Sequence, residues 1–217
     1  FPNAYWQSEP KWWKDGRGFY ISYNQRGHQA YRIIEVNRQG VPRVIIDEQA
    51  KTYFEYSSKR VFETADDGRD IVWMSERDGW AHRYLYDGLK GQVKRQITRG
   101  KWAVRAVVDV DAIKRTITFT ANGMRPGEDP YFVHYYRINF DGTGLVPLTD
   151  GAGTHSVTFS PDKQHYIDIW SRVDMAPVAQ LRRASDAAVL LTLETADATA
   201  LVAAGWAAPE SFIAKGR

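Results

Sequence analysis

The chain of 217 residues contains no cysteine, and this absence excludes disulfide bonds, a thiol nucleophile and zinc sites built on thiolates. It also lacks a large excess of charge of either sign. The 29 Lys and Arg residues nearly balance the 26 Asp and Glu residues, which gives a formal net charge of +3. The basic residues are scattered rather than gathered in a stripe, so we expect no nucleic-acid partner. No apolar run approaches the ~18 residues of a membrane span, because the longest candidate, 196–208, is interrupted by Asp197, Thr199 and Gly205.

The short motifs of common enzyme classes are missing as well. No Gly-x-Ser-x-Gly pentapeptide is present to place the nucleophile of an α/β-hydrolase, and no glycine-rich phosphate loop followed by Lys-Ser or Lys-Thr occurs. The nearest Ser-His pair is His155-Ser156. Neighbours on a strand point to opposite faces, so we interpret this pair as loop residues that open a strand. We therefore expect no catalytic residue in this chain.

Metal and cofactor sites are not expected either. The five histidines, His28, His82, His134, His155 and His165, show none of the close spacing of a helical zinc site. The Asp-Gly pairs lack the dense run of Asp and Asn ligands that a calcium loop needs. Ordinary turns explain these pairs, because Gly accepts a positive φ and Asp hydrogen-bonds within its own turn.

What the sequence does contain is a fourfold internal repeat of about fifty residues. Each unit opens with a turn and continues into a strand that ends in small or polar residues. Tyr23, Ser75, Ala121 and Ser171 align at spacings of 52, 46 and 50 residues. A period of about 40–50 residues with several short strands per repeat is typical of β-propeller blades.

The repeat therefore predicts an all-β fold, a partial β-propeller of about four blades with four antiparallel strands each. A β-sandwich could hold strands of similar spacing, but the repeat period favours the propeller. After Glu194 the pattern changes, and residues 196–204, rich in Ala and Leu, predict a short C-terminal helix within a linker.

Aromatic residues are frequent, with eight Trp and twelve Tyr. Most are expected to fill the space between blades. Polar loops at equivalent positions of the blades would line one face of a propeller, and two such loops are the candidate site, 23–29 and 76–80. Their candidate substrate-facing residues are Arg26, His28, Glu76, Arg77 and Trp80.

Several stretches together resemble the propeller region of dipeptidyl peptidase IV-like enzymes of the prolyl oligopeptidase family. These stretches are Tyr23–Gln29, Ser75–Trp80, Tyr84–Asp87, Ile97–Gly100 with Trp102, Pro126–Tyr131, Tyr136–Asn139 with Asp141-Gly142, Ser156–Asp162 and Trp170–Asp174. The resemblance extends from about Trp12 to Arg217 and is specific only when the pieces are taken together.

The resemblance implies an eight-bladed propeller that caps an α/β-hydrolase domain with Ser, Asp and His, in a serine peptidase that removes N-terminal Xaa-Pro or Xaa-Ala dipeptides. Residues 1–195 are expected to be the second half of that propeller, and 196–217 a linker towards a hydrolase domain that this chain lacks. The Glu pair that would bind the peptide amino group is expected upstream, because Asp47-Glu48 stands in a different context. No catalytic residue is therefore transferred to this chain.

From the resemblance we expect a non-catalytic propeller region that gates substrate access in a proteolytic parent. Its partners would be its own hydrolase domain and peptide substrates, with a periplasmic or secreted location. Half a ring would expose apolar blade faces, so the isolated chain is expected to self-associate. The alternatives are a free-standing β-propeller that binds proteins and a carbohydrate-binding module that uses Trp and Tyr rings.

Overall fold

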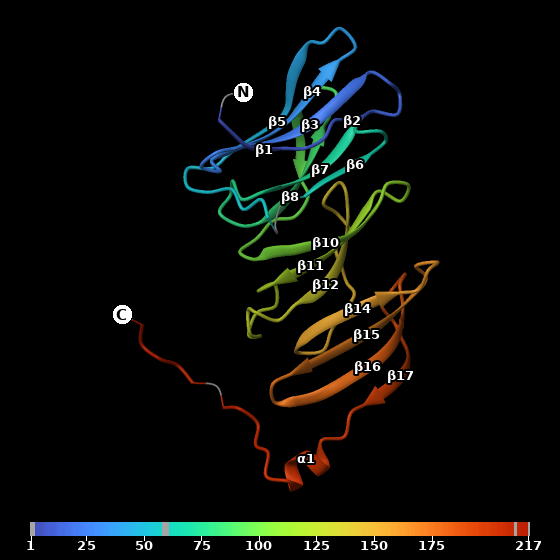
Figure 1. Cartoon of the computed structure of the whole chain (residues 1–217). Helices are drawn as coiled ribbons and strands as arrows, with labels where there is room; N and C mark the ends of the chain where they lie inside the picture. The colour runs from blue at the N-terminus through green and yellow to red at the C-terminus, as the bar shows by residue number, and fades with distance from the viewer. Residues whose placement is uncertain (1–2, 58–60, 211, 217) are drawn as a thin grey trace. The chain divides into compact units, whose positions relative to one another are not determined.

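The computed structural model describes residues 3–57, 61–210 and 212–216. These residues form seventeen β-strands and one short α-helix. Figure 1 shows the strands as arrows and the short helix near the C-terminal end of the chain. The chain divides into two compact units. Unit one is Phe1–Thr120 with Arg137–Leu145, and unit two is Ala121–Tyr136 with Val146–Arg217.

The strands belong to four separate sheets in which each strand pairs with the next along the chain, except that β1 pairs with β3 and not with β2. The first sheet contains β1 (Ala4–Gln7), β2 (Lys11–Trp12), β3 (Gly18–Gln25), β4 (Ala30–Asn37) and β5 (Pro42–Gln49). The second contains β6 (Phe62–Ala65), β7 (Asp70–Ser75), β8 (His82–Asp87) and β9 (Gln92–Gln96). The third contains β10 (Ala103–Asp111), β11 (Thr116–Asn122), β12 (His134–Asn139) and β13 (Val146–Pro147). The fourth contains β14 (Thr154–Phe159), β15 (His165–Arg172), β16 (Met175–Arg183) and β17 (Val189–Thr195).

The sheets follow the predicted repeat. Tyr23, Ser75, Ala121 and Ser171 fall on β3, β7, β11 and β15, which occupy equivalent places in their sheets. The first sheet differs in one respect, because β1 and β2 both pair with β3 and together form an interrupted edge strand. The sequence did not suggest these two short strands.

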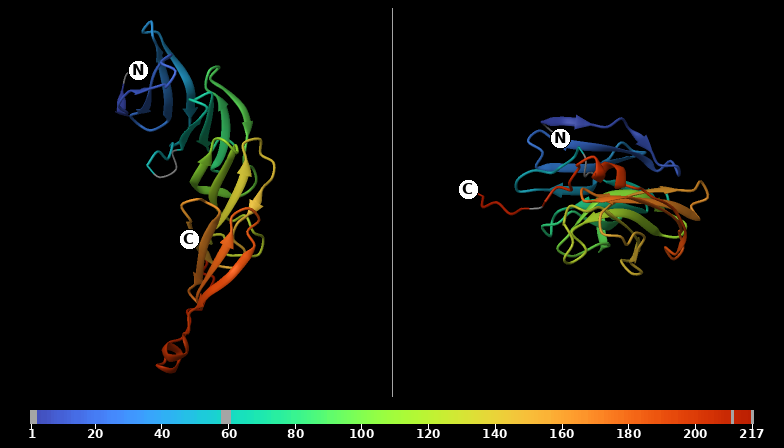
Figure 2. Two further views of the ribbon diagram at one scale, coloured as in Figure 1. Left: turned by 90° about the vertical axis from the view of Figure 1, so that its right-hand side faces the viewer. Right: turned by 90° about the horizontal axis from the view of Figure 1, so that it is seen from below.

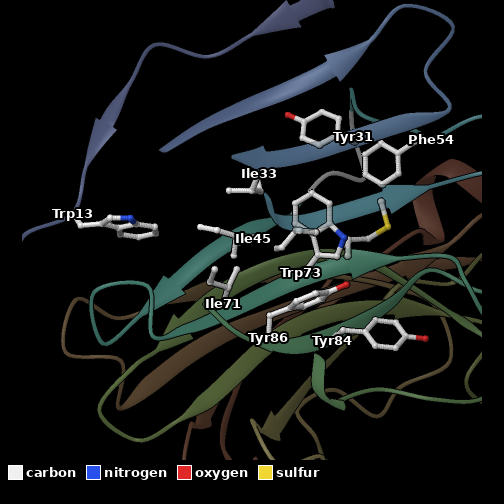
Figure 3. Close-up of a cluster of buried hydrophobic side chains, with 11 residues drawn as sticks. Trp13, Tyr31, Ile33, Ile45, Phe54, Ile71, Trp73, Tyr84 and Tyr86 are labelled. Carbon is white, nitrogen blue, oxygen red and sulfur yellow. The ribbon is translucent and has the colours of Figure 1, made fainter. Parts of the chain in front are cut away.

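Large aromatic and aliphatic side chains from the first two sheets form the core of unit one (Figure 3). Every residue of β7 is buried. Trp73 is fully buried, and its ring is stacked on that of Phe54, with 6.0 Å between centroids. Ile33, Ile45 and Ile71 fill the space beside it. Burying an aliphatic side chain of this size contributes about 2 kcal/mol.

The buried carboxylate of Glu35 accepts hydrogen bonds from several side chains of unit one. Glu35 accepts hydrogen bonds from Trp13 Nε1 at 2.6 Å and from Arg43 Nε at 2.8 Å. Arg43 also donates to the backbone of the turn after β8, at Gly88 and Leu89. A buried charge is tolerated only when it is paired and hydrogen-bonded. Glu35 and Arg43 therefore connect the first sheet to the second.

Unit two has a smaller core around Leu148, Tyr166 and Ala184, and the Tyr166 hydroxyl donates to the Leu148 carbonyl at 2.5 Å. The sheet β14–β17 is followed by α1 (Thr199–Ala203), which lies beyond β17 with no buried residue (Figure 2). The helix is shorter than the predicted 196–204. It begins late because Asp197 Oδ1 accepts from Thr199 N at 2.8 Å in a local turn. Among the described residues no helix is long and apolar enough to cross a membrane.

Candidate functional site

The five predicted site residues lie on two loops of unit one, each joining the second strand of a sheet to the third. Arg26 and His28 are in the β3–β4 loop, and Glu76, Arg77 and Trp80 are in the β7–β8 loop. Residues 50–57, which connect the first sheet to the second, contact both loops. Phe54 N donates to the His28 carbonyl at 2.7 Å. A cavity of about 450 Å³ is lined by residues 48–54 together with Glu76 and Arg77.

The His28 ring is surrounded by tyrosines. It stacks on Tyr56 with 4.6 Å between centroids and meets the edge of Tyr5 at 4.5 Å and that of Tyr53 at 5.5 Å. Its Nδ1 lies 3.2 Å from Asn24 Oδ1. His28 has a φ of 55°, so the loop is bent in the left-handed region and turns the ring towards the tyrosines. The sequence had suggested His28 but not the three rings around it.

The same cluster changes the acidity of one phenol. The hydrogen bond between Tyr56 and Tyr5 raises the pKa of Tyr56 to about 12, and partial burial and the neighbouring Tyr53 and Glu55 act in the same direction. The Tyr56 hydroxyl therefore stays protonated at neutral pH. A group of neutral rings beside an imidazole can stack on a planar or apolar ligand group.

Arg77 points back into the protein and forms an ion pair. Its Nη2 lies 2.8 Å from Glu48 Oε2 and 2.6 Å from the Tyr86 hydroxyl, and its Nε donates to Ser75 Oγ at 2.7 Å. The guanidinium also lies 4.6 Å from the centre of the Tyr84 ring. Burial lowers the pKa of Arg77, but the Tyr86 hydrogen bond and the Glu48 charge outweigh it and raise that pKa overall. Arg77 is therefore a charged group that is already paired.

Glu48 is the residue that sequence reasoning missed at this site. It is buried at the end of β5 and accepts hydrogen bonds from Trp73 Nε1 at 3.0 Å and Ser75 Oγ at 2.6 Å, in addition to Arg77. Glu48 had been considered only as a substitute for an amino-group anchor. Its three donors show that it is an internal acceptor joining β5 to β7. The sequence carries one signal for an inward carboxylate, because Glu48 follows Ile46 by two residues and such residues of a strand point to the same face.

The other predicted residues are exposed. Arg26 is exposed, and its backbone N–H donates to Asn3 O at 2.7 Å. Trp80 is 41% exposed and follows the turn in which Gly79 N donates to Glu76 O at 2.9 Å. Glu76 is exposed and lines the cavity with Arg77. Arg26, Glu76 and Trp80 can therefore reach a bound molecule without breaking the fold, whereas Arg77, which is also partly exposed, is held by its pairing with Glu48.

Among the described residues that line this cavity, none is Ser, Cys or His. The His–Asp contact that most resembles part of a catalytic triad is in unit two, where His155 Nδ1 lies 2.7 Å from Asp168 Oδ1. His155 is buried on β14, and its Nε2 faces the Gly151 carbonyl at 2.7 Å instead of a serine hydroxyl. Ser156 is exposed, on the opposite face of the strand. His155 and Ser156 thus lie within a strand and not at its opening, and they cannot share a proton.

The described residues contain no group of three or more His, Cys, Asp or Glu side chains that could hold a metal ion. In unit two, His134 and His155 direct both ring nitrogens at internal partners. His134 Nε2 lies 2.7 Å from Glu128 Oε2, and its Nδ1 lies 3.3 Å from Thr149 Oγ1. In unit one, His82 makes equivalent contacts to Thr98 Oγ1 and Gly100 O, each at 3.0 Å.

Comparisons with known proteins show what this chain is similar to. Residues 2–177 match the family model described as the dipeptidyl peptidase IV (DPP IV) N-terminal region. Dipeptidyl peptidase 4 of Arthroderma otae is 32% identical over 98 residues, which cover 44% of this chain and 12% of that protein. Dipeptidyl peptidase 4 of Trichophyton equinum gives the same identity and coverage. The crystal structure of Porphyromonas gingivalis dipeptidyl peptidase 4 aligns with a TM-score of 0.68 at 27% identity, over 87% of this chain and 26% of that one.

These comparisons confirm the predicted resemblance and the predicted all-β, partial propeller fold of about four blades. The chain spans 12% of the length of the curated relatives it matches and 26% of the solved structure. The matched relatives are thus much longer proteins, of which this chain corresponds to a propeller part.

Proposed function

The chain belongs to the family of dipeptidyl peptidase IV N-terminal regions, and from this membership we propose that it is the non-catalytic propeller region of a serine exopeptidase. The family match over residues 2–177 is the observation that carries the proposal. In this proposal the Ser, Asp and His act in an α/β-hydrolase domain of the same protein. The whole protein removes Xaa-Pro or Xaa-Ala dipeptides from peptide N-termini.

The role of the propeller in this proposal is to gate access to the catalytic domain. A wall of blades admits short or unfolded peptides and excludes folded proteins, and it keeps bulk water from the reacting groups. The exposed loop residues Arg26, Glu76 and Trp80 and the half-buried His28 would meet the substrate. Arg77 would act indirectly, because its guanidinium holds Glu48 in place.

Hydrolysis of a chromogenic Gly-Pro or Ala-Pro substrate tests the proposal. The full-length natural protein that carries this sequence should release the chromophore, and this chain by itself should not. If the full-length protein does not hydrolyse the substrate, this result would contradict the proposed exopeptidase activity and favour a free-standing propeller that binds proteins. Activity of the chain alone would contradict its non-catalytic role. We also propose a periplasmic or secreted location, which cell fractionation with the same substrate would test.

Self-association of the isolated chain is a further part of the proposal. In the fourth sheet, Ile167 pairs with Leu181 and Leu181 with Leu191, so the three side chains share one face. Ile167 is 38% exposed and Leu191 is 56% exposed. An exposed apolar sheet face of this kind promotes association.

Light scattering of the isolated chain should therefore show a dimer or larger species. Leu191→Lys should shift it towards the monomer, because a charge on the shared face opposes apolar contact. The matched control is Val173→Lys, at an exposed position in the turn between β15 and β16, which should leave the distribution unchanged. A monomer at all concentrations would overturn this part of the proposal.

A further inference from the structure

The interruption between β1 and β2 opens a groove in unit one. Ser8 N donates to Ser22 O at 2.9 Å, but Ser22 N turns to Ser8 Oγ, also at 2.9 Å, instead of to a backbone carbonyl. Pro10 follows and has no N–H to continue the ladder. The space beside this break measures about 640 Å³, within the range of ligand sites. We name it the β1–β6 groove and define it by Trp6, Glu9, Tyr20, Phe62 and Glu63.

The strands that border the groove are edge strands. Among the described residues, β1 and β2 pair only with β3, and β6 pairs only with β7. All four residues of β1 are exposed. An edge strand presents unpaired N–H and C=O groups, which an extended peptide can use by adding itself as a further strand. The backbone around the groove therefore suits an extended peptide chain.

Aromatic side chains form the walls of the groove. Trp6 is 45% exposed, which is a large exposed fraction for a tryptophan on a strand. The rings of Tyr20 and Phe62 lie 5.3 Å apart, and Tyr20 is held from behind by Trp13 at 4.3 Å. Tyr20 and Phe62 are therefore fixed by packing, while Trp6 leaves an open ring face for a ligand.

The described residues that line the groove carry more negative than positive charge. Among them, Glu9 and Glu63 contribute carboxylates and Lys11 contributes the one cation. Nearby Asp67 already accepts from the backbone N–H groups of Lys14 and Asp15. Burial, then the charges of Glu63 and Asp67, raise the pKa of Tyr20, which places the negative field of these carboxylates at the groove floor.

We propose that the β1–β6 groove binds an extended peptide through a Lys or Arg side chain. The cation lies over the open face of Trp6 and pairs with Glu63 or Glu9, because an aromatic ring and a carboxylate both attract a positive charge. The peptide backbone pairs with the free edge of β1 or β6. The inference rests on the proposed function, since it names the part of the propeller that would hold a peptide and the side chain that it prefers.

Direct binding to the full-length natural protein tests the inference without turnover. The probe is acetyl-Ala-Ala-Lys-Ala-Ala-amide, whose blocked ends remove any contribution from free termini. The matched peptides carry Gln or Glu in place of Lys. Isothermal titration should rank affinity as Lys above Gln above Glu, with the Lys preference weakened by added salt.

Variants locate the site. Trp6→Ala and Glu63→Gln should each weaken binding of the Lys peptide by about threefold to fivefold. Trp12→Ala is the control, because Trp12 is also an exposed tryptophan on an edge strand paired with β3 but does not line the groove. Circular dichroism checks that each variant is folded.

Three results would overturn the inference: no binding of the Lys peptide, equal binding of the three peptides, or equal weakening by Trp6→Ala and Trp12→Ala. The proposed function is overturned by a different result, namely that the full-length protein does not hydrolyse Gly-Pro substrates. A protein that binds the Lys peptide but cleaves nothing would keep the groove and lose the exopeptidase. A protein that cleaves Gly-Pro substrates but does not bind the Lys peptide would support the exopeptidase proposal and overturn the groove proposal.

Discussion

His155 Nδ1 lies 2.7 Å from Asp168 Oδ1, and both side chains are completely buried. The other ring nitrogen of His155 faces the Gly151 carbonyl at 2.7 Å, so both nitrogens have acceptors as neighbours. Arg182 Nε lies 3.3 Å from the second Asp168 oxygen. Asp168 is therefore a buried carboxylate shared by an imidazole and a guanidinium in unit two.

Replacing Asp168 should be costly because it removes a buried carboxylate that contacts the His155 ring and pairs with the buried Arg182. We expect Asp168→Asn to lower the free energy of unfolding by about 3 kcal/mol or more, as measured by urea denaturation. Asp174→Asn is the control, since Asp174 pairs with Arg172 on the surface at 2.8 Å, and its midpoint should not move. Equal effects of the two substitutions would refute the buried role of Asp168.

The pH dependence of stability should contain a contribution from His134. Burial, then the positive charge of Arg125, lower the pKa of His134, despite the opposing Glu128. The unfolded chain takes up the proton near the ordinary pKa of about 6.5, before the folded protein does. Stability is therefore fully present above that pH and falls as the pH drops from about 6.5 towards the lowered pKa.

A comparison of unfolding free energies between pH 8 and pH 5 checks this expectation. His134→Gln should give a flatter profile than the natural sequence, because glutamine takes up no proton. His165→Gln, at a partly exposed position on β15, is the control substitution. An unchanged slope for His134→Gln would contradict the assignment.

Gly68 should tolerate no side chain. Its φ is +77°, and a Cβ built there would come within 2.1 Å of Trp13 Cζ3 in the core of unit one. We expect Gly68→Ala to cost about 1 kcal/mol of backbone strain and a further 1–3 kcal/mol of overpacking. Gly79→Ala, with φ +90° but open space around it, should cost the backbone part alone. Thermal melts of both variants measure the difference, and similar melting temperatures would contradict the packing argument.

Two residues of the candidate site should behave differently. Arg77→Met removes the cation that pairs with the buried Glu48, so it should lower stability by about 1–2 kcal/mol, less than for a fully buried pair because the arginine is partly exposed. Trp80→Ala should leave stability unchanged and, if the loop meets the substrate, raise KM in the full-length protein. Urea denaturation and peptidase kinetics separate the two effects. A stable Arg77→Met variant would show that the Glu48 pair contributes nothing.

Much of the fold was predictable because it is encoded in neighbouring residues. The apolar run in 70–75 and the Asp-Gly turns before and after it predicted the strands of the second sheet, and the repeat period predicted their equivalents in the other three sheets. The edge strands β1 and β2 were not anticipated, because Pro10 interrupts the alternation there. The predicted C-terminal helix was too long at its start, because the Asp197 turn competes with helix formation.

The candidate site was predictable only as a pair of equivalent loops. The sequence alone determined the all-β class, the repeat, the absence of thiol chemistry and the position of the loops that carry His28 and Arg77. Tertiary structure decided that Arg77 turns inward to Glu48, 29 residues away, and that His155 pairs with Asp168 across two strands. The physical reason is that periodicity acts between near neighbours in the chain. Which charges become buried partners depends on strand register and on how one sheet packs against the next.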